Sequence, residues 1–228
     1  MRFDIISANP AILKSSLTTG LIGRACEKGY VEIYVHNLRD YAEGSYKQID
    51  DEPYGGGAGM ILKPEPFFRC IKELQSQREY DEVIYFSPQG DIYDQKIANF
   101  YSLKNSFLLL CGHYKGIDER VRQHLITMEI SIGNYVLTGG ELAACVIADS
   151  VVRLIPGVLG DESSALDDSF QDGLLAPPVY TRPADYKGWK VPEILLSGNE
   201  KQIQDWRLQQ SIKRTEQRRP DLMEGREG

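Results

Sequence analysis

Three short apolar runs, each stopped by a glycine-containing turn, constrain the fold of this chain most strongly. The runs are residues 83–86, 107–110 and 126–130, and the turns are residues 87–90, 111–116 and 131–140. Apolar runs of this length between turn residues predict strands that are buried on both faces, as in a parallel sheet. Ligands of open α/β sheets bind beyond the carboxyl ends of such strands. We therefore expect the three turns to surround one small molecule with backbone N–H and C=O groups, because glycine permits close approach.

The rest of the first 160 residues also alternates between strand and helix patterns. None of the three turns fits G-x-G-x-x-G or a P-loop, which disfavours a Rossmann or Walker site. Pro10 and Pro64 are placed to open helices, and residues 38–62 have the composition of a long loop. Strands are predicted at 3–7 and 30–35, and helices at 10–29, from 64, near 94–103, near 117–124 and at 138–155. This alternation predicts an α/β domain with a mainly parallel sheet.

The composition changes after the last of these helices. Residues 160–169 are acidic, small and poor in apolar side chains, which is typical of a flexible linker. Residues 170–196 contain four prolines and can hold only short helices or turns, whereas 199–219 reads as a helix closed by Pro220. We therefore predict three parts: an α/β domain at 1–159, a linker at 160–169, and a small α-helical domain at 170–228.

Charge is distributed unevenly along the chain. The net charge of the 228 residues is −7, yet residues 170–228 hold ten basic and nine acidic side chains. Three arginines of the predicted C-terminal helix, Arg207, Arg214 and Arg218, share one stripe of its surface. Such a stripe indicates phosphate contacts, and an ordinary solvated helix face is the alternative.

Several classes of protein are disfavoured by the sequence. The first residues lack the basic and apolar regions of a signal peptide, and no apolar stretch approaches the length of a membrane helix. The four cysteines are widely spaced, without a C-x-x-C motif, and there are only three histidines. We expect reduced thiols in a cytoplasmic protein, with no zinc or other metal site and no membrane partner.

Two charged residues near the predicted linker form the main catalytic hypothesis. Arg153 stands at the end of an apolar helix, and Asp168 ends the linker, so they could serve one substrate as electrostatic stabiliser and general base. The alternative is an arginine that complements a helix dipole and a solvated aspartate. His36 and His113 suggest structural or substrate-contact roles. The glycine run at 55–59 suggests a surface loop, or one that orders over a ligand.

Six longer segments carry a resemblance to a known family. In this order along the chain they closely resemble the bacterial tRNA (guanine-N1)-methyltransferases of the TrmD type, over about residues 4–220. The segments are 36–40, 51–60, 111–120, 131–141, 153–160 and 180–183.

The resemblance implies a fold and a ligand that the composition does not show. The parallel sheet would end in a deep trefoil knot of the SPOUT class, and the glycine turns would hold S-adenosylmethionine. The chain would form a homodimer with the active site between subunits, so that Asp168 serves the donor held by the partner. By position, the residues that would bind the donor are Pro88, Gly112, Tyr114, Gly116, Ile132, Gly133, Tyr135, Leu137, Gly139 and Gly140.

The resemblance also implies roles in the reaction. Asp168 would remove the N1 proton of the guanosine immediately 3′ of the tRNA anticodon (position 37), and Arg153 would stabilise the charge on O6. Arg182, Arg207, Arg214 and Arg218 would bind tRNA, and DNA is not an expected partner.

Two positions depart from the common pattern of the family. Lys115 and Ala176 stand where many members have acidic residues that are linked to magnesium, so a magnesium requirement is doubtful here. Two other functions stay open at this point. One is an enzyme of the same fold class that acts on another RNA or base. The other is a non-catalytic RNA-binding module, which would have no need of both Arg153 and Asp168. A phosphate-handling enzyme built on the glycine run is disfavoured, because no lysine or metal-binding acid accompanies that run.

Overall fold

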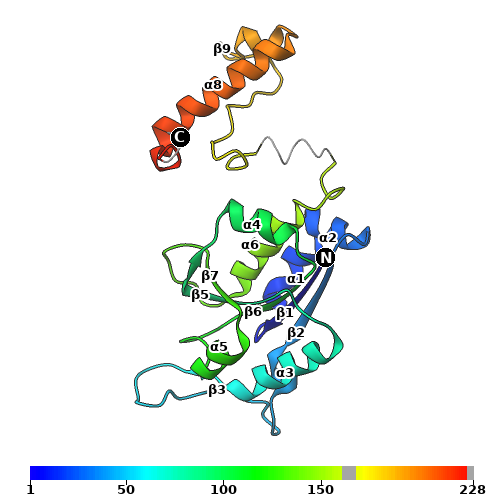
Figure 1. The fold of residues 1–228 in the computed structure, drawn as a ribbon, viewed down its shortest axis with the longest axis vertical. Helices are drawn as coiled ribbons and strands as arrows, with labels where there is room; N and C mark the ends of the chain where they lie inside the picture. The colour runs from blue at the N-terminus through cyan, green and yellow to red at the C-terminus, as the bar shows by residue number, and fades with distance from the viewer. Residues whose placement is uncertain (161–167, 225–228) are drawn as a thin grey trace. The chain divides into compact units, whose positions relative to one another are not determined.

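The computed structural model describes residues 1–160 and 168–224, and the chain divides into two compact units, Met1–Gly160 and Asp161–Gly228. Most of the predicted linker, residues 161–167, lies outside the described residues. The first unit is built on a five-stranded sheet in the order β2-β1-β6-β5-β7, and all of its strand pairs are parallel (Figure 1). The strands are β1 (Arg2–Ser7), β2 (Glu32–Asn37), β5 (Glu82–Ile92), β6 (Ser106–Leu110) and β7 (Met128–Ser131). The α/β class and the parallel sheet predicted from the sequence are confirmed, and the trefoil knot stays a prediction.

Helices cover both faces of this sheet, as Figure 1 shows. On one face, Phe3 and Ile5 of β1 pack with α1 (Ala11–Thr18), α2 (Gly20–Glu27), α4 (Gln95–Ser102) and α6 (Glu141–Val152). On the other face, Ile6 packs with α3 (Pro64–Gln77) and α5 (Glu119–Leu125). Successive strand residues point to opposite faces, so the apolar residues of β1 and the continuous apolar run of β6 supply both cores.

Two predicted elements differ from the structure. The single helix predicted at 10–29 is two helices, because Thr19 is extended and Gly20 has a φ of +63°. The sequence signal for the break was Gly20, which a helix interior disfavours. The predicted turn at 87–90 is an irregularity within β5, which pairs with β7 both before and after it. Residues 87–90 therefore bulge from a continuous strand instead of ending it.

The predicted loop at 38–62 holds three short elements. They are the 3₁₀ helix η1 (Leu38–Tyr41) and the antiparallel strands β3 (Asp50–Asp51) and β4 (Ile61–Leu62). The end of this segment is tied to the loop after β6, because Lys115 N donates to Met60 O (3.1 Å) and Leu62 N donates to Gly116 O (3.0 Å). The segment that contains the glycine run therefore lies beside the loop at 111–116.

The second unit has a smaller set of elements. It contains the 19-residue helix α8 (Glu200–Arg218), the 3₁₀ helices η2 (Glu193–Leu196) and η3 (Pro220–Leu222), and a hairpin of β8 (Asp185–Tyr186) and β9 (Trp189–Lys190). The hairpin was not predicted, since residues 170–196 were expected to form only short helices or turns. Asn199 caps α8 by accepting a hydrogen bond from Gln202 N (3.3 Å). In the part of the chain that the structure describes, no helix is long and apolar enough to cross a membrane.

Candidate active site

A cavity of about 310 Å³ lies at the carboxyl ends of β6 and β7 and beside the bulge in β5. Its walls come from the bulge in β5, the loop after β6 and the loop after β7, which are the three turns singled out in the sequence. All ten residues predicted to bind the donor line this cavity: Pro88, Gly112, Tyr114, Gly116, Ile132, Gly133, Tyr135, Leu137, Gly139 and Gly140. The structure therefore brings the predicted set together, whereas their role stays a prediction.

Backbone contacts between the loops explain why glycine occupies the cavity floor. Gly140 N donates to Gly112 O (2.9 Å), which joins the loop after β7 to the loop after β6. A Cβ on Gly140 would lie 2.8 Å from Cys111 Cα, closer than real Cβ atoms approach backbone. Gly116 has a φ of +115°, a conformation that side chains disfavour. These glycines allow the loops to meet at close range.

A buried polar network lies at the junction of these loops, and the sequence analysis missed it. Glu141, at the start of α6, is 1% exposed. Its Oε1 atom accepts a hydrogen bond from Ser7 Oγ (2.5 Å), and its Oε2 atom lies 2.8 Å from His113 Nε2. Asn9 Nδ2 lies 3.2 Å from the same His113 nitrogen. The network connects the end of β1, the loop after β6 and the N-terminus of α6. The available signal was an acidic residue directly after Gly139-Gly140 that opens an otherwise apolar helix.

The rim of the cavity carries larger side chains. Tyr114 and Tyr135 line it and are 56% and 55% exposed, and Tyr114 has a φ of +58°. Lys115 also lines the cavity, and its side chain lies along the glycine run, 3.2 Å from where a Cβ of Gly59 would be. A side chain at Gly59 would therefore displace Lys115, so the glycine run lets this cation lie against the loop.

The two predicted catalytic residues belong to different units, and each is described within its own. Arg153 is half-buried directly after α6, with its N–H donating to Asp149 O (3.2 Å). Asp168 is half-buried and lines a second cavity, of about 700 Å³, within the second unit. Arg182 and Arg207 line that same cavity. The predicted base and two of the predicted RNA-binding arginines therefore line one cavity.

The predicted arginine stripe on α8 is not uniform. Arg207 and Arg218 are exposed, whereas Arg214 is half-buried and its Nη1 donates to Ala176 O (3.1 Å). One donor of Arg214 therefore holds the segment that precedes the hairpin. Thr215, which is fully buried, fixes the same segment by accepting from Leu175 N (2.9 Å).

Comparison with known proteins supplies the family. Residues 1–225 match the family described as tRNA (Guanine-1)-methyltransferase TrmD. A tRNA (guanine-N(1)-)-methyltransferase of Bacteroides fragilis is 60% identical over 224 residues, which cover 98% of this chain and all of the relative. The relative of the same description from Bacteroides thetaiotaomicron is 59% identical, with the same coverage. One from Azobacteroides pseudotrichonymphae is 61% identical over 97% of this chain and all of the relative.

The chain belongs to this family. It is a tRNA (guanine-N1)-methyltransferase, an enzyme that transfers a methyl group to guanine in tRNA. The alternative of a non-catalytic RNA-binding module is therefore wrong. A methyltransferase needs a site for its methyl donor, and the cavity between the three loops is the candidate that the structure offers.

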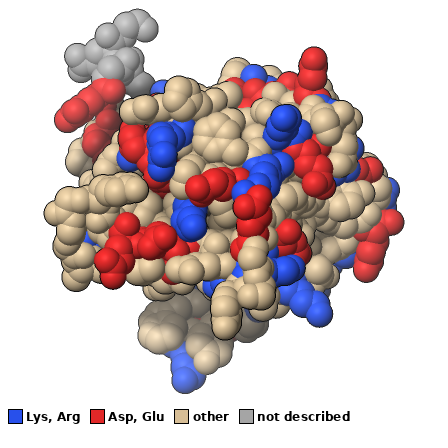
Figure 2. All heavy atoms as spheres, turned by 90° about the horizontal axis from the view of Figure 1, so that it is seen from below, with Lys and Arg blue, Asp and Glu red and all other residues tan. Residues whose placement is uncertain are grey.

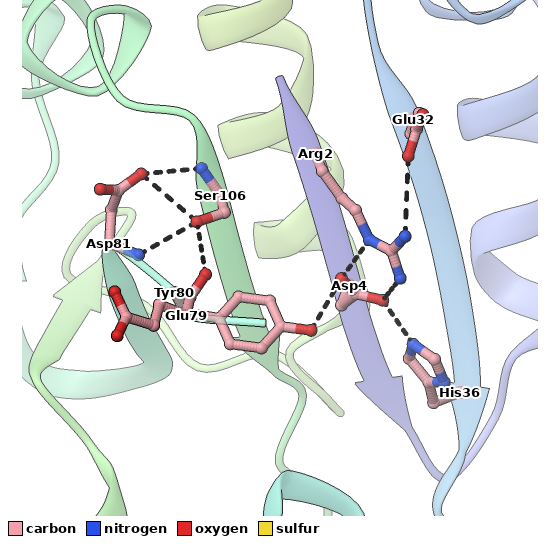
Figure 3. Close-up of polar contacts among 8 residues, drawn as sticks. All are labelled: Arg2, Asp4, Glu32, His36, Glu79, Tyr80, Asp81 and Ser106. Carbon is pink, nitrogen blue, oxygen red and sulfur yellow. Dashed lines mark hydrogen bonds and ion pairs between the residues drawn. The ribbon is translucent and has the colours of Figure 1, made fainter. Parts of the chain in front are cut away.

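His36 does not belong to this methyltransferase's candidate site. Its Nε2 lies 2.7 Å from Oδ1 of Asp4, in a buried cluster that also contains Arg2 and Tyr80 (Figure 3). Asp4 is fully buried and, two residues before Ile6 in β1, lies on the face of the sheet that packs with α3. Burial raises the pKa of Asp4, but hydrogen bonds from His36, Arg2 and Tyr80 outweigh burial and lower it to about 2. The histidine therefore has the structural role that the sequence analysis considered.

Within residues 1–160 and 168–224, no group of three or more histidine, cysteine, aspartate or glutamate side chains could hold a metal ion. Cys70 and Cys111 are buried thiols, and burial raises the pKa of each.

Basic and acidic side chains alternate on the face of the molecule in Figure 2. Charges of both signs are therefore interspersed on this face.

Proposed function

We propose that this enzyme transfers the methyl group of S-adenosylmethionine to N1 of guanosine 37, the nucleotide immediately 3′ of the tRNA anticodon. The observation that carries the proposal is the convergence of three loops on one cavity lined by all ten predicted donor-binding residues. The proposal includes a cytoplasmic homodimer, in which Asp168 of one subunit serves the donor cavity of the other. A SPOUT-type knot is part of the same proposal.

The residues of the cavity fit an adenosyl sulfonium. Apolar groups of Ile132 and Leu137 can contact the adenine and ribose faces, while the loop backbones offer donors and acceptors to their edges. A Cβ on Gly112 would lie 3.0 Å from the Tyr85 ring, so any other residue at this position would crowd that ring at the wall of the cavity. The donor supplies an electrophilic methyl group on a positively charged sulfur.

Two side chains handle the proton and the charge of the acceptor base. N1 of guanine carries a proton at neutral pH, so the nitrogen is a poor nucleophile until this proton leaves. The Asp168 carboxylate accepts the proton as the new N1–C bond forms and the S–C bond breaks, which leaves a neutral thioether. Electron density that moves onto O6 during this transfer is stabilised by the Arg153 guanidinium. The base must be turned out of its loop stack to reach such a site.

Nucleoside mass spectrometry tests the reaction. A tRNA transcript with guanosine at position 37 is incubated with the enzyme and S-adenosylmethionine, digested, and compared with a transcript that has adenosine there. We expect one added methyl group, on N1 of guanosine, in the first transcript only. Methylation of both transcripts, or at another atom, would contradict the proposed site of reaction.

A mixed-dimer experiment tests the sharing of the active site. Arg153→Ala and Asp168→Asn homodimers should each be inactive. If Asp168 acts on the partner's donor, random exchange makes about half of the dimers mixed, with one of two sites intact, so about a quarter of wild-type activity returns. If Asp168 acts within its own chain, mixing restores no activity.

The residues at positions 115 and 176 do not fit a magnesium-assisted site. Lys115 places a cation at the cavity where an acidic ligand would be needed, and Ala176 offers no side-chain oxygen. We propose that Lys115 itself supplies positive charge near the acceptor. With tRNA kept folded by spermidine, activity should persist in EDTA. Activity that EDTA abolishes and only magnesium restores would refute this role.

A further inference from the structure

The β8–β9 hairpin of the second unit exposes two large aromatic rings. Tyr186 is 55% exposed and Trp189 is 73% exposed, and the two are cross-strand partners with ring centroids 6.2 Å apart. A tryptophan side chain this exposed is unusual, because its large apolar surface favours burial. No part of the proposed reaction uses this pair.

The backbone of the hairpin holds these rings in a defined place. Lys187 and Gly188 have φ values of +55° and +86°, as a two-residue turn of type I′ requires. Gly188 N donates to Asp185 Oδ1 (2.8 Å), and Val191 N donates to Ala184 O (2.9 Å) at the open end. The hairpin therefore presents its rings without needing to order first, which reduces the entropic cost of binding.

One cation lies near the Tyr186 ring, and two more are close to the hairpin in the sequence. Lys187 Nζ lies 5.5 Å from the centre of the Tyr186 ring, and Lys190 follows Trp189 directly. Arg182 is exposed three residues before the hairpin and lines the cavity that also contains Asp168. Residues 182–190 hold three basic side chains and one acidic side chain, Asp185, which already accepts the Gly188 N–H. Aromatic faces flanked by cations match the two parts of a nucleotide, its base and its phosphate.

We propose that the β8–β9 hairpin is a stacking platform for an unpaired base of the tRNA. Trp189 and Tyr186 contact the face of the base, and Lys190 contacts a neighbouring phosphate. The inference rests on the proposed function only in taking a tRNA loop as the ligand, and it assigns recognition to residues outside the arginine stripe. A single-stranded loop is required, because bases within a duplex do not expose their faces.

Equilibrium binding of the tRNA transcript to full-length variants tests this inference. Trp189→Ala should raise the Kd about 5- to 150-fold, the range of one lost base stack. Trp189→Phe should keep most of the affinity, whereas Trp189→Leu, which keeps apolar volume but lacks a π-face, should lose it. Tyr46→Ala is the matched control, because Tyr46 is 93% exposed in the first unit and should leave the Kd unchanged.

Salt and fluorescence provide readouts that a merely structural role would not change. Lys190→Gln should lower the slope of log K against log salt by about one, while Trp189→Phe leaves this slope unchanged. The chain has two tryptophans, so Trp206→Phe leaves Trp189 as the only indole reporter. Addition of tRNA should then quench its emission, as stacking on a base requires.

Three results would overturn the inference. They are an unchanged Kd for Trp189→Ala, equal affinity of the phenylalanine and leucine variants, and dissociation of the dimer by Trp189→Ala, which would make the hairpin a contact between copies of this chain. A wild-type enzyme that binds the transcript but does not methylate position 37 would contradict the proposed function alone.

Discussion

The two compact units of this methyltransferase differ in how far their side chains are buried. The first unit buries two apolar cores on the faces of its sheet, and its loops enclose a cavity. Among the described residues of the second unit, only Leu174, Ser211 and Thr215 are buried. Large apolar side chains such as Val179, Trp189 and Leu208 are more than half exposed there. This contrast fits our proposal that the first unit holds the methyl donor and that the second contacts tRNA through its side chains.

This difference in burial predicts which property a substitution should change in each unit. Loops fixed to a parallel sheet hold a ligand through backbone groups, so a substitution acts mainly through sterics and packing. A surface of exposed arginines, lysines and aromatic rings binds through the side chains themselves, and each contributes separately. Substitutions should therefore lower stability and donor affinity in the first unit, and tRNA affinity in the second.

The largest effect should come from the one side chain of the second unit that we assign to catalysis. Asp168→Asn removes the proton acceptor, so kcat should fall about 10²- to 10⁴-fold, the usual contribution of a general base. The Kd values for tRNA and donor should stay within about twofold of wild type, since the change removes no assigned binding contact. Single-turnover assays and equilibrium binding measure both. Asp172→Asn, which changes a carboxylate of the same cavity, is the matched control and should keep its activity.

The second-largest effect should be a loss of stability of the first unit when the buried network around Glu141 is broken. Glu141→Ala leaves Ser7 and His113 without their shared buried acceptor, which should lower the free energy of unfolding by about 3 kcal/mol. Glu141→Gln keeps one acceptor oxygen and should lose less. Urea denaturation provides the measurement. Equal stability of Glu141→Ala and wild type would show that the network does not hold the loops together.

Low pH should lower the stability of the first unit, because the Asp4 carboxylate becomes protonated. Its folded-state pKa of about 2 lies below the ordinary 3.8, so its contribution to stability is complete above about pH 4 and disappears as the pH falls towards 2. The shift corresponds to about 2 kcal/mol of unfolding free energy. Urea denaturation between pH 2 and 5 should show this loss, and Asp4→Asn should flatten the profile over that range. A wild-type profile that is already flat there would contradict the role of the Asp4 cluster.

The smallest effects should distinguish the arginines of α8. Arg218→Ala and Arg207→Ala should each reduce the salt slope of tRNA binding by about one and leave stability unchanged. Arg214→Ala should also lower stability, by about 1 kcal/mol, because Arg214 donates to Ala176 O. Thermal denaturation separates the two kinds of arginine. A loss of stability in all three variants would show that the stripe is structural.

The sequence was most informative where short-range patterns decide the structure. The three apolar runs predicted β5, β6 and β7, the pattern of residues 3–7 predicted β1, and the glycine turns predicted where the cavity forms. Patterns of this kind are local, since a strand buried on both faces has few residue types available to it. The family resemblance then selected Asp168 and Arg153, which the local sequence left as one hypothesis among others.

The features that the sequence did not reveal depend on contacts between distant segments. Glu141 meets Ser7 across 134 positions, and Arg214 meets Ala176 across 38. Continuation of β5 past residue 87 depends on its pairing with β7 after the bulge. The hairpin at 185–190 depends on two residues with positive φ, of which only Gly188 gave a signal.

Titration of S-adenosylmethionine into full-length variants, without RNA, tests most directly the claim that the donor site is complete in the first unit. Gly140→Ala places a Cβ 2.8 Å from Cys111 Cα, so it should weaken donor binding at least about tenfold. Gly160→Ala, whose Cβ would meet no atom within 4 Å, should bind as wild type does. Asp168→Asn and Trp189→Ala should also match wild type. Normal binding by Gly140→Ala, or weakened binding by either variant of the second unit, would contradict the division of roles between the two units.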